Sequence, residues 1–171
     1  LEDFHHISVP CVLVTNEAKD VPFRNLSSVS SDDVLAAEMA IDHLVSLGHR
    51  NIGIIGGYWE HSDITVLRCQ GCKKAFEKWD IPFTDVQYEA VRFSYEDGYR
   101  GAKALLERNP QLTAIFAMSD VMAIGAIRAL RDMGKRIPED ISLVGFDGLT
   151  LSDYTVPRLT TVAQSSQALV D

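Results

Sequence analysis

Residues 113–146, TAIFAMSDVMAIGAIRALRDMGKRIPEDISLVGF, decide the fold. TAIFAM and ISLVGF are nearly unbroken apolar runs, which is typical of strands buried on both faces of a sheet. Between them, Ser119 or Asp120 can cap a helix, and Gly134 can end it. The residues expected to face inward from this helix, at helical spacing, are Ala123, Ile124, Ile127 and Leu130. This order predicts two parallel strands joined by a helical crossover.

The same alternation extends outward to both sides of this stretch. Further strands are expected at 12–14, 51–56, 86–91 and 159–162, and further helices after 30–33, at 63–79 and from 94. The apolar stripe predicted for the 63–79 helix consists of Cys69, Cys72, Ala75, Phe76 and Trp79. Buried strands separated by amphipathic helices predict an α/β fold with a doubly wound parallel sheet. The polar stretch 16–33 is expected to connect this sheet with another one.

The composition indicates a globular domain that does not itself bind nucleic acid. Of the 171 residues, 46% are hydrophobic and 23% are charged, and 16 Lys+Arg against 24 Asp+Glu give a net charge of −8. Binding to a phosphate backbone requires clustered Lys and Arg. No apolar run reaches the roughly 20 residues of a membrane span, and residues 1–20 lack the pattern of a secretion signal. Since the 3 cysteines form no disulfide framework, we expect a cytoplasmic protein without a membrane partner.

Polar and aromatic residues recur where the predicted strands end. Ligands of open parallel sheets bind beyond the carboxyl ends of the strands. The residues expected to line such a site are Arg68, Phe93, Ser119, Asp120 and Asp147. Arg and Asp side chains can each engage two adjacent hydroxyl groups, and an aromatic face can pack on a ring. This set suits a small polyhydroxylated or heteroaromatic ligand.

Each of these residues also has a purely structural interpretation. Ser119 and Asp120 are ordinary helix caps, and Asp147-Gly148 is a common turn dipeptide. Arg68 could lie solvated on its helix, and Phe93 could pack as a staple before a helix. The functional interpretation depends on all of them meeting at the same edge of the sheet.

Signatures of enzymes and metal sites are missing from the sequence. It has no G-x-S-x-G elbow, no phosphate-binding loop and no G-x-G-x-x-G fingerprint. Cys69-x-x-Cys72 lacks a second pair of ligands and lies in a predicted helix stripe, so core packing is favoured over zinc or redox chemistry. We therefore expect no catalytic residues, no metal and no cofactor.

The order of motifs resembles the effector-binding domain of the lactose-repressor/galactose-repressor family of bacterial transcription regulators. The matching stretches are HLVSLGHRNIGIIGG (43–57), RCQG (68–71), SYEDGYRGAKALL (94–106), TAIFAMSDVMAIGAIRAL (113–130), GKRIPEDISLVGFDGL (134–149) and PRLTTVAQS (157–165). The resemblance implies a periplasmic-binding-protein-like fold of type I, with two subdomains and the effector between them. Residues 1–30 would be the tail of the N-terminal subdomain, 31–163 most of the C-terminal subdomain, and 164–171 a crossing segment.

The resemblance also implies roles for individual residues. Arg68 matches the family arginine that binds the effector, Asp147 a carboxylate on the opposite wall, Phe93 a ligand-contacting aromatic position and Gln164 a polar residue of the crossing segment. Ser119 stands where many sugar-responsive members carry Asn. A sugar-sensing repressor is thus expected, a homodimer that binds operator DNA through a helix-turn-helix outside this segment. A periplasmic sugar-binding protein and, less favoured, a sugar-modifying hydrolase are the alternatives.

Overall fold

The computed structural model describes residues 9–14 and 25–164. The chain divides into two compact units, Leu1–Asp32 with Ser165–Asp171, and Asp33–Gln164. In the first unit, strands β1 (Cys11–Val14) and β2 (Leu26–Val29) pair in parallel. Strand β2 lies within the stretch that was expected to be only a connection. Of the predicted crossing segment 164–171, only Gln164 belongs to the described residues.

The second unit confirms the predicted α/β fold with a parallel sheet. Its strands are β3 (Ile52–Gly56), β4 (Tyr88–Ala90), β5 (Ala114–Ala117), β6 (Ser142–Asp147) and β7 (Thr160–Ala163). They form one sheet in the order β4-β3-β5-β6-β7, and every neighbouring pair is parallel. Because β4 lies on one side of β3 and β5 on the other, the strand order reverses between β3 and β5. Such a topological switch point is where open α/β sheets bind ligands.

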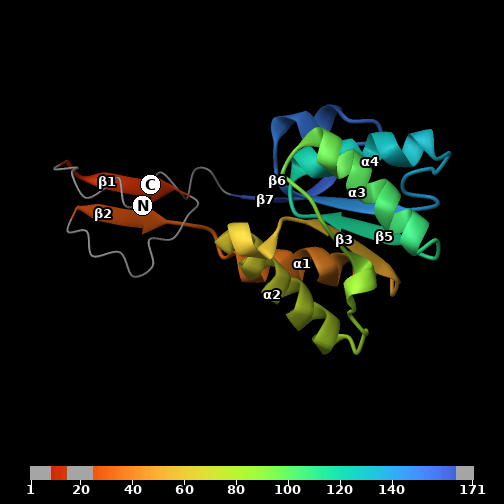
Figure 1. Cartoon of the computed structure of the whole chain (residues 1–171), viewed down its shortest axis with the longest axis horizontal. Coiled ribbons are helices and arrows are strands. Elements are labelled where there is room, and N and C mark those ends of the chain that lie inside the picture. Colours follow the sequence, from red (N-terminus) through yellow and green to blue (C-terminus); the bar gives the residue numbers. More distant parts are fainter. Residues whose placement is uncertain (1–8, 15–24, 165–171) are drawn as a thin grey trace. The chain divides into compact units, whose positions relative to one another are not determined.

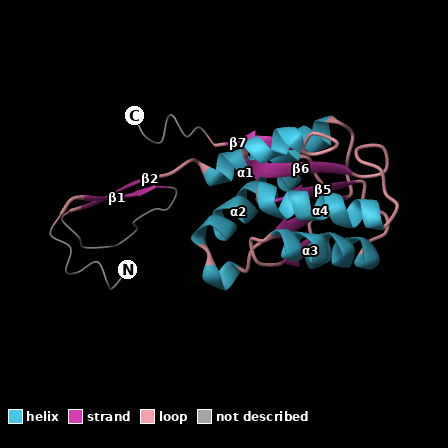
Figure 2. Cartoon of the chain, turned by 90° about the horizontal axis from the view of Figure 1, so that it is seen from above, coloured by secondary structure: helices cyan, strands magenta, loops and turns pink. Residues whose placement is uncertain are grey.

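Four helices cover the two faces of this sheet (Figures 1 and 2). They are α1 (Asp33–Ser46), α2 (Asp63–Lys78), α3 (Tyr95–Arg108) and α4 (Asp120–Asp132), with short 3₁₀ helices η2 (Trp59–His61), η3 (Asp85–Gln87) and η4 (Thr150–Tyr154) between elements. Helices α1 and α2 pack on one face, and α3 and α4 on the other. The core between these layers is apolar, and Phe76, Phe116 and Phe146 are its largest fully buried side chains.

Glycines let the paired helices approach closely. A Cβ atom added to Gly71 of α2 would lie 2.1 Å from the carbonyl oxygen of Val34 in α1. A Cβ atom added to Gly125 of α4 would lie 2.0 Å from the carbonyl oxygen of Tyr95 in α3. Since no side chain fits at such distances, each helix pair is held at the separation that glycine permits.

Two local predictions were wrong. Trp79 was expected on the buried stripe of α2, but it follows the end of the helix, is 40% exposed and donates from Nε1 to Asp42 Oδ1 at 2.6 Å. The predicted strand 86–91 is shortened to β4 because residues 85–87 form η3. A capping box between Thr84 and Gln87 stabilises that turn.

Arg108 covers the outer side of β4, an edge strand of the sheet. Its Nε atom donates to the carbonyl oxygen of Val86 at 3.1 Å, and its Nη2 atom donates to that of Tyr88 at 2.9 Å. Its Nη1 atom also lies 2.8 Å from Oε2 of Glu89. The end of α3 thus supplies hydrogen bonds that no further strand provides.

Candidate functional site

Arg68 lies in the interior of the second unit, although arginine is rarely buried without a partner. It belongs to the second turn of α2, which begins after Ser62 caps the helix through a bond from Thr65 N. The side chain is 5% exposed, and Nε donates to Oδ1 of Asp33 at 2.8 Å. Nη1 donates to the carbonyl oxygen of Met118, the residue after β5. The solvated alternative for Arg68 is therefore wrong.

Phe146 supports the guanidinium group from one face. The Cζ atom of Arg68 lies 3.6 Å from the centroid of the Phe146 ring, which is fully buried in β6. Such a cation–π contact in a desolvated place stabilises by about 2 kcal/mol. The ring and the two hydrogen bonds hold the guanidinium in one orientation beside the switch point between β3 and β5.

Asp147 and Gln164 lie against Arg68. Oδ1 of Asp147, the last residue of β6, is 3.9 Å from Nη2 of Arg68. The same oxygen accepts a 3.0 Å hydrogen bond from Nε2 of Gln164, whose backbone N–H donates to the Asp147 carbonyl at 3.1 Å. Burial raises the pKa of the Asp147 carboxyl, and the nearby Arg68 charge and the Gln164 hydrogen bond partly offset that rise. We call Arg68, Asp33, Asp147 and Gln164 the Arg68 cluster.

The backbone of Asp147 is unusual. Its φ angle is +120°, a conformation that is rare for a residue with a side chain, and Gly148 follows at +75°. Asp147 thus ends a strand in an unfavourable conformation rather than occupying an ordinary turn. Such outliers concentrate at functional sites, where the surrounding structure maintains them.

Asp120 and Ser119 are placed near this edge, but their side chains are engaged by the protein. Asp120 is fully buried, and its Oδ2 atom accepts hydrogen bonds from Leu149 N at 2.7 Å and Ser152 Oγ at 2.8 Å. Its Oδ1 atom accepts from Thr161 Oγ1 at 2.6 Å. Ser119 is 4% exposed and caps α4 by accepting a bond from Met122 N at 3.2 Å. Ser119 is thus the helix cap of its structural alternative. Asp120 is structural in another way, because its carboxylate binds the segment after β6 and β7 and does not cap the helix.

Phe93 stands at a separate part of the same edge, where β4 leads into α3. It is 43% exposed and its ring lies beside Gly57, because a Cβ atom added there would be 2.7 Å from Cε2 of Phe93. The same added Cβ atom would be 2.3 Å from Oγ1 of Thr65, a buried polar atom without a hydrogen-bond partner among the described residues. Trp59 stacks on Tyr88 at 4.5 Å between ring centroids. This part of the edge is aromatic and backbone-lined, whereas the Arg68 cluster is charged.

The sequence reasoning missed two functional candidates, Asp33 and Phe146. Asp33 was interpreted as part of the start of a helix, and Phe146 as a strand residue. The signal that could have found Asp33 is a physical requirement, since a buried arginine needs an acidic partner. Two adjacent acids, Asp32 and Asp33, stand at the start of the first predicted helix. Because one acid is enough to cap a helix, the second was a candidate partner for a buried arginine.

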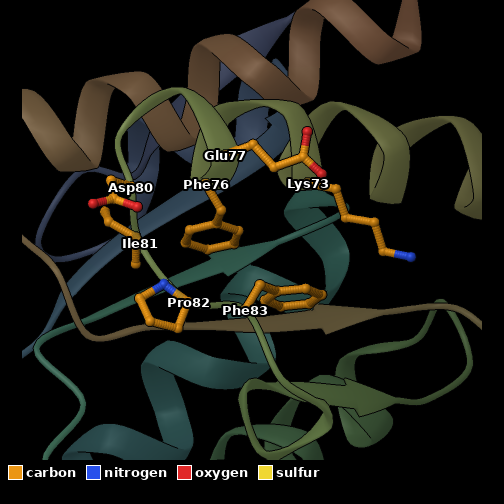
Figure 3. Close-up of a pocket in the computed structure, with 7 residues that line it drawn as sticks. All are labelled: Lys73, Phe76, Glu77, Asp80, Ile81, Pro82 and Phe83. Atoms are coloured by element: carbon orange, nitrogen blue, oxygen red, sulfur yellow. The ribbon is translucent and has the colours of Figure 1, made fainter.

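A cavity of about 490 Å³ lies at the other end of the sheet, where α2 leads toward β4 (Figure 3). It is lined by Lys73, Phe76, Glu77, Asp80, Ile81, Pro82 and Phe83. The rings of Phe76 and Phe83 stack face to face with 5.0 Å between centroids. None of the predicted site residues lines this cavity.

The described residues contain no group of three His, Cys, Asp or Glu side chains arranged to hold a metal ion. Within the same part of the chain, no helix is long and apolar enough to cross a membrane. Cys69 and Cys72 are free and buried in α2. Burial raises the pKa of the Cys69 thiol to about 11 and that of Cys72 also well above its usual value. This agrees with core packing for the Cys-x-x-Cys pair.

Comparison with known proteins identifies the family. Residues 41–171 match the model of the periplasmic binding protein-like domain, so the chain belongs to that family. It is 38% identical to the HTH-type transcriptional regulator DegA of Bacillus subtilis, over 96% of this chain and 47% of DegA. It is 36% identical to the HTH-type transcriptional repressor CytR of Escherichia coli, over 92% of this chain and 45% of CytR. The structure of a transcriptional regulator CelR–cellobiose complex superposes with a TM-score of 0.84 at 31% identity, over 92% of this chain and 48% of that one.

These matches confirm the predicted resemblance to the effector-binding domain of LacI-family regulators. These curated relatives are HTH-type transcriptional regulators. The chain spans about half the length of the curated relatives it matches.

Proposed function

We propose that this chain is the ligand-sensing part of a DNA-binding transcriptional repressor that binds a small sugar or sugar-like effector at the Arg68 cluster. The observation that carries the proposal is the placement of a buried guanidinium 3.9 Å from a carboxylate, beside the point where the strand order reverses. Hydroxyl groups donate to a carboxylate and accept from a guanidinium, so a diol satisfies both groups at once. The relatives that are HTH-type regulators support a cytoplasmic regulator over a periplasmic transport protein.

Effector binding would act on DNA through a change in conformational equilibrium. A ligand shifts such an equilibrium only by its difference in affinity for the two states. Operator contacts would come from a helix-turn-helix outside this segment, because the sequence carries a net charge of −8.

The test is calorimetry of the full chain with a panel of sugars. Arg68→Ala and Asp147→Ala should each weaken binding of a sugar that the wild type binds by roughly 1.5–3 kcal/mol, since each removes a charged hydrogen-bond partner of the sugar hydroxyls. Arg128→Ala and Asp132→Ala are matched controls, because these side chains form a surface ion pair and are 74% and 39% exposed. Unchanged affinity in both cluster variants would remove the site assignment.

We further propose that the protein is a homodimer, and that the segment 149–156 takes part in the interface. This short segment carries four exposed large apolar side chains: Leu149 39%, Leu151 47%, Tyr154 77% and Val156 69%. Sedimentation of Tyr154→Asp should show weakened dimerisation. Met39→Asp is the control, since Met39 is 55% exposed on α1, over the opposite face of the sheet. Loss of the dimer in the control alone would assign the interface to α1.

A further inference from the structure

The Arg68 cluster contains more negative than positive charge. Oδ1 of Asp33 is 2.8 Å from Nε of Arg68, and Oδ1 of Asp147 is 3.9 Å from Nη2. In the described part of the chain, neither carboxylate forms an ion pair with a second Lys or Arg. Two acids therefore share one base, and the buried Asp120 adds a further acid on the same side. A guanidinium whose charge is already compensated offers little attraction to an anion.

The hydrogen-bonding geometry of Arg68 leads to the same conclusion. Arginine binds phosphate and carboxylate strongly when two of its N–H groups point at the anion in parallel. Nε has a single hydrogen, and it is given to Asp33. Nη1 already donates to the carbonyl oxygen of Met118, and the ring of Phe146 covers one face. One hydrogen on Nη1 and two on Nη2 remain. Because Nε is engaged, the side-on pair of Nε and Nη2 cannot hold an anion in parallel, and the remaining N–H groups suit separate hydroxyls.

Resting on the function proposed above, we infer that this site takes an uncharged polyhydroxylated effector and rejects its phosphorylated or carboxylated forms, and that Asp33 sets this selectivity. An anion placed on Nη2 would lie beside the carboxylate of Asp147, where burial weakens the screening of their repulsion. A neutral sugar meets no such repulsion, since its hydroxyl can donate to Asp147 and accept from Arg68.

The first experiment uses inorganic phosphate as an anionic probe of the full chain. Wild-type protein should show no saturable phosphate binding by calorimetry at constant ionic strength. Asp33→Asn keeps an oxygen that accepts from Arg68 but removes one negative charge, and it should bind phosphate at least about tenfold more tightly, as expected for a unit charge a few ångströms away. Adding Arg68→Leu to Asp33→Asn should abolish the gain.

Asp132→Asn is the matched control, because it makes the same change of charge at a surface ion pair with Arg128, outside the segment 149–156. Equal phosphate affinity in Asp33→Asn and Asp132→Asn would overturn the role of Asp33. Arg68-dependent binding of phosphate by the wild type would overturn the exclusion of anions. The exclusion of anions is tested without Asp33→Asn, because the wild type should bind no phosphate and Arg68→Leu in the wild type shows whether any binding depends on Arg68. The exclusion is therefore decided even if Asp33→Asn fails to fold.

The second experiment compares neutral sugars with their phosphate esters, namely glucose with glucose 6-phosphate and ribose with ribose 5-phosphate. In any pair that binds, the neutral sugar should bind more tightly, and a preference for the ester would refute the inference. If neither member of any pair binds, the sugar effector of the proposed function loses its support. The phosphate experiment would still decide the claim about charge, so the two failures are distinguishable.

Discussion

Replacing Asp120 by alanine should strongly destabilise the second unit. One carboxylate at the start of α4 accepts three hydrogen bonds, at 2.7 Å from Leu149 N, 2.8 Å from Ser152 Oγ and 2.6 Å from Thr161 Oγ1. These donors come from the segment after β6 and from β7. The carboxylate therefore connects α4 with the part of the chain that carries Asp147.

The magnitude follows from the surroundings of the three donors. Ser152 is 3% exposed, so its hydroxyl would lose a charged acceptor that water cannot replace, at a cost of about 1.5–3 kcal/mol. Leu149 and Thr161 are reached by solvent, and each should contribute about 1 kcal/mol. Asp120→Ala should thus lower the free energy of unfolding by about 3.5–5 kcal/mol in total.

Asp120→Asn should lower it by only about 1–2 kcal/mol. The amide keeps one oxygen for Leu149 and Ser152, and the hydroxyl of Thr161 can rotate to accept from its NH₂ group. Urea unfolding followed by circular dichroism measures both variants. Asp153→Ala is the control, with an expected change within about 0.5 kcal/mol, because that carboxylate is 62% exposed.

A loss below about 1 kcal/mol for Asp120→Ala would refute this reasoning. The hydrogen bonds would then contribute little, and the carboxylate would be available to an effector, as the sequence predicted. Loss of sugar binding in Asp120→Asn, with stability unchanged, would support that interpretation directly.

Four further perturbations have defined outcomes. Gly125→Ala should lower the free energy of unfolding by about 1–3 kcal/mol, because its Cβ would meet the Tyr95 carbonyl oxygen at 2.0 Å; unchanged urea unfolding would contradict this contact. Burial raises the pKa of the Asp147 carboxyl in the folded protein. At a pH below the usual Asp pKa, Asp147→Asn should therefore have no stability advantage over wild type. Its free energy of unfolding relative to wild type should increase as the pH rises through the raised pKa. Hydrogen bonds from Arg136 lower the pKa of the Asp140 carboxyl, so wild type should be more stable than Asp140→Asn at neutral pH and should lose that advantage as the pH falls. If the pH profiles of unfolding of either variant run parallel to that of wild type, the prediction for that residue is contradicted. The Cys72 thiol should resist a disulfide reagent at pH 8 in the folded chain and react after denaturation, and rapid modification of the native protein would contradict its burial.

The layers of the second unit were predictable because buried parallel strands require continuous apolar runs. The sequences IGIIG of β3 and AIFA of β5 carry this signal directly. Strand β2, with the sequence LSSV, does not, because two of its four residues are polar. Trp79 was misplaced because a helical stripe does not indicate where the helix ends, and its indole instead found Asp42 as an acceptor.

The edge of the site was predictable, but its charge balance was not. The rule that ligands bind at the carboxyl ends of strands selects Arg68 and Asp147 without knowledge of any contact. The pairing of Arg68 with Asp33 joins residues 35 positions apart, and no local pattern encodes it. The same holds for Asp120, since capping propensity is visible in sequence whereas hydrogen bonds from residues 29–41 positions away are not.

The position of Arg108 along β4 has a consequence for self-association. An uncovered strand at the margin of a sheet is a template on which another chain can add its own backbone. Here the guanidinium group of Arg108 donates to the carbonyl oxygens of Val86 and Tyr88. A strand from another chain would therefore compete with Arg108 for these two acceptors. A single long side chain thereby occupies two of the acceptors that an added strand would need at this margin.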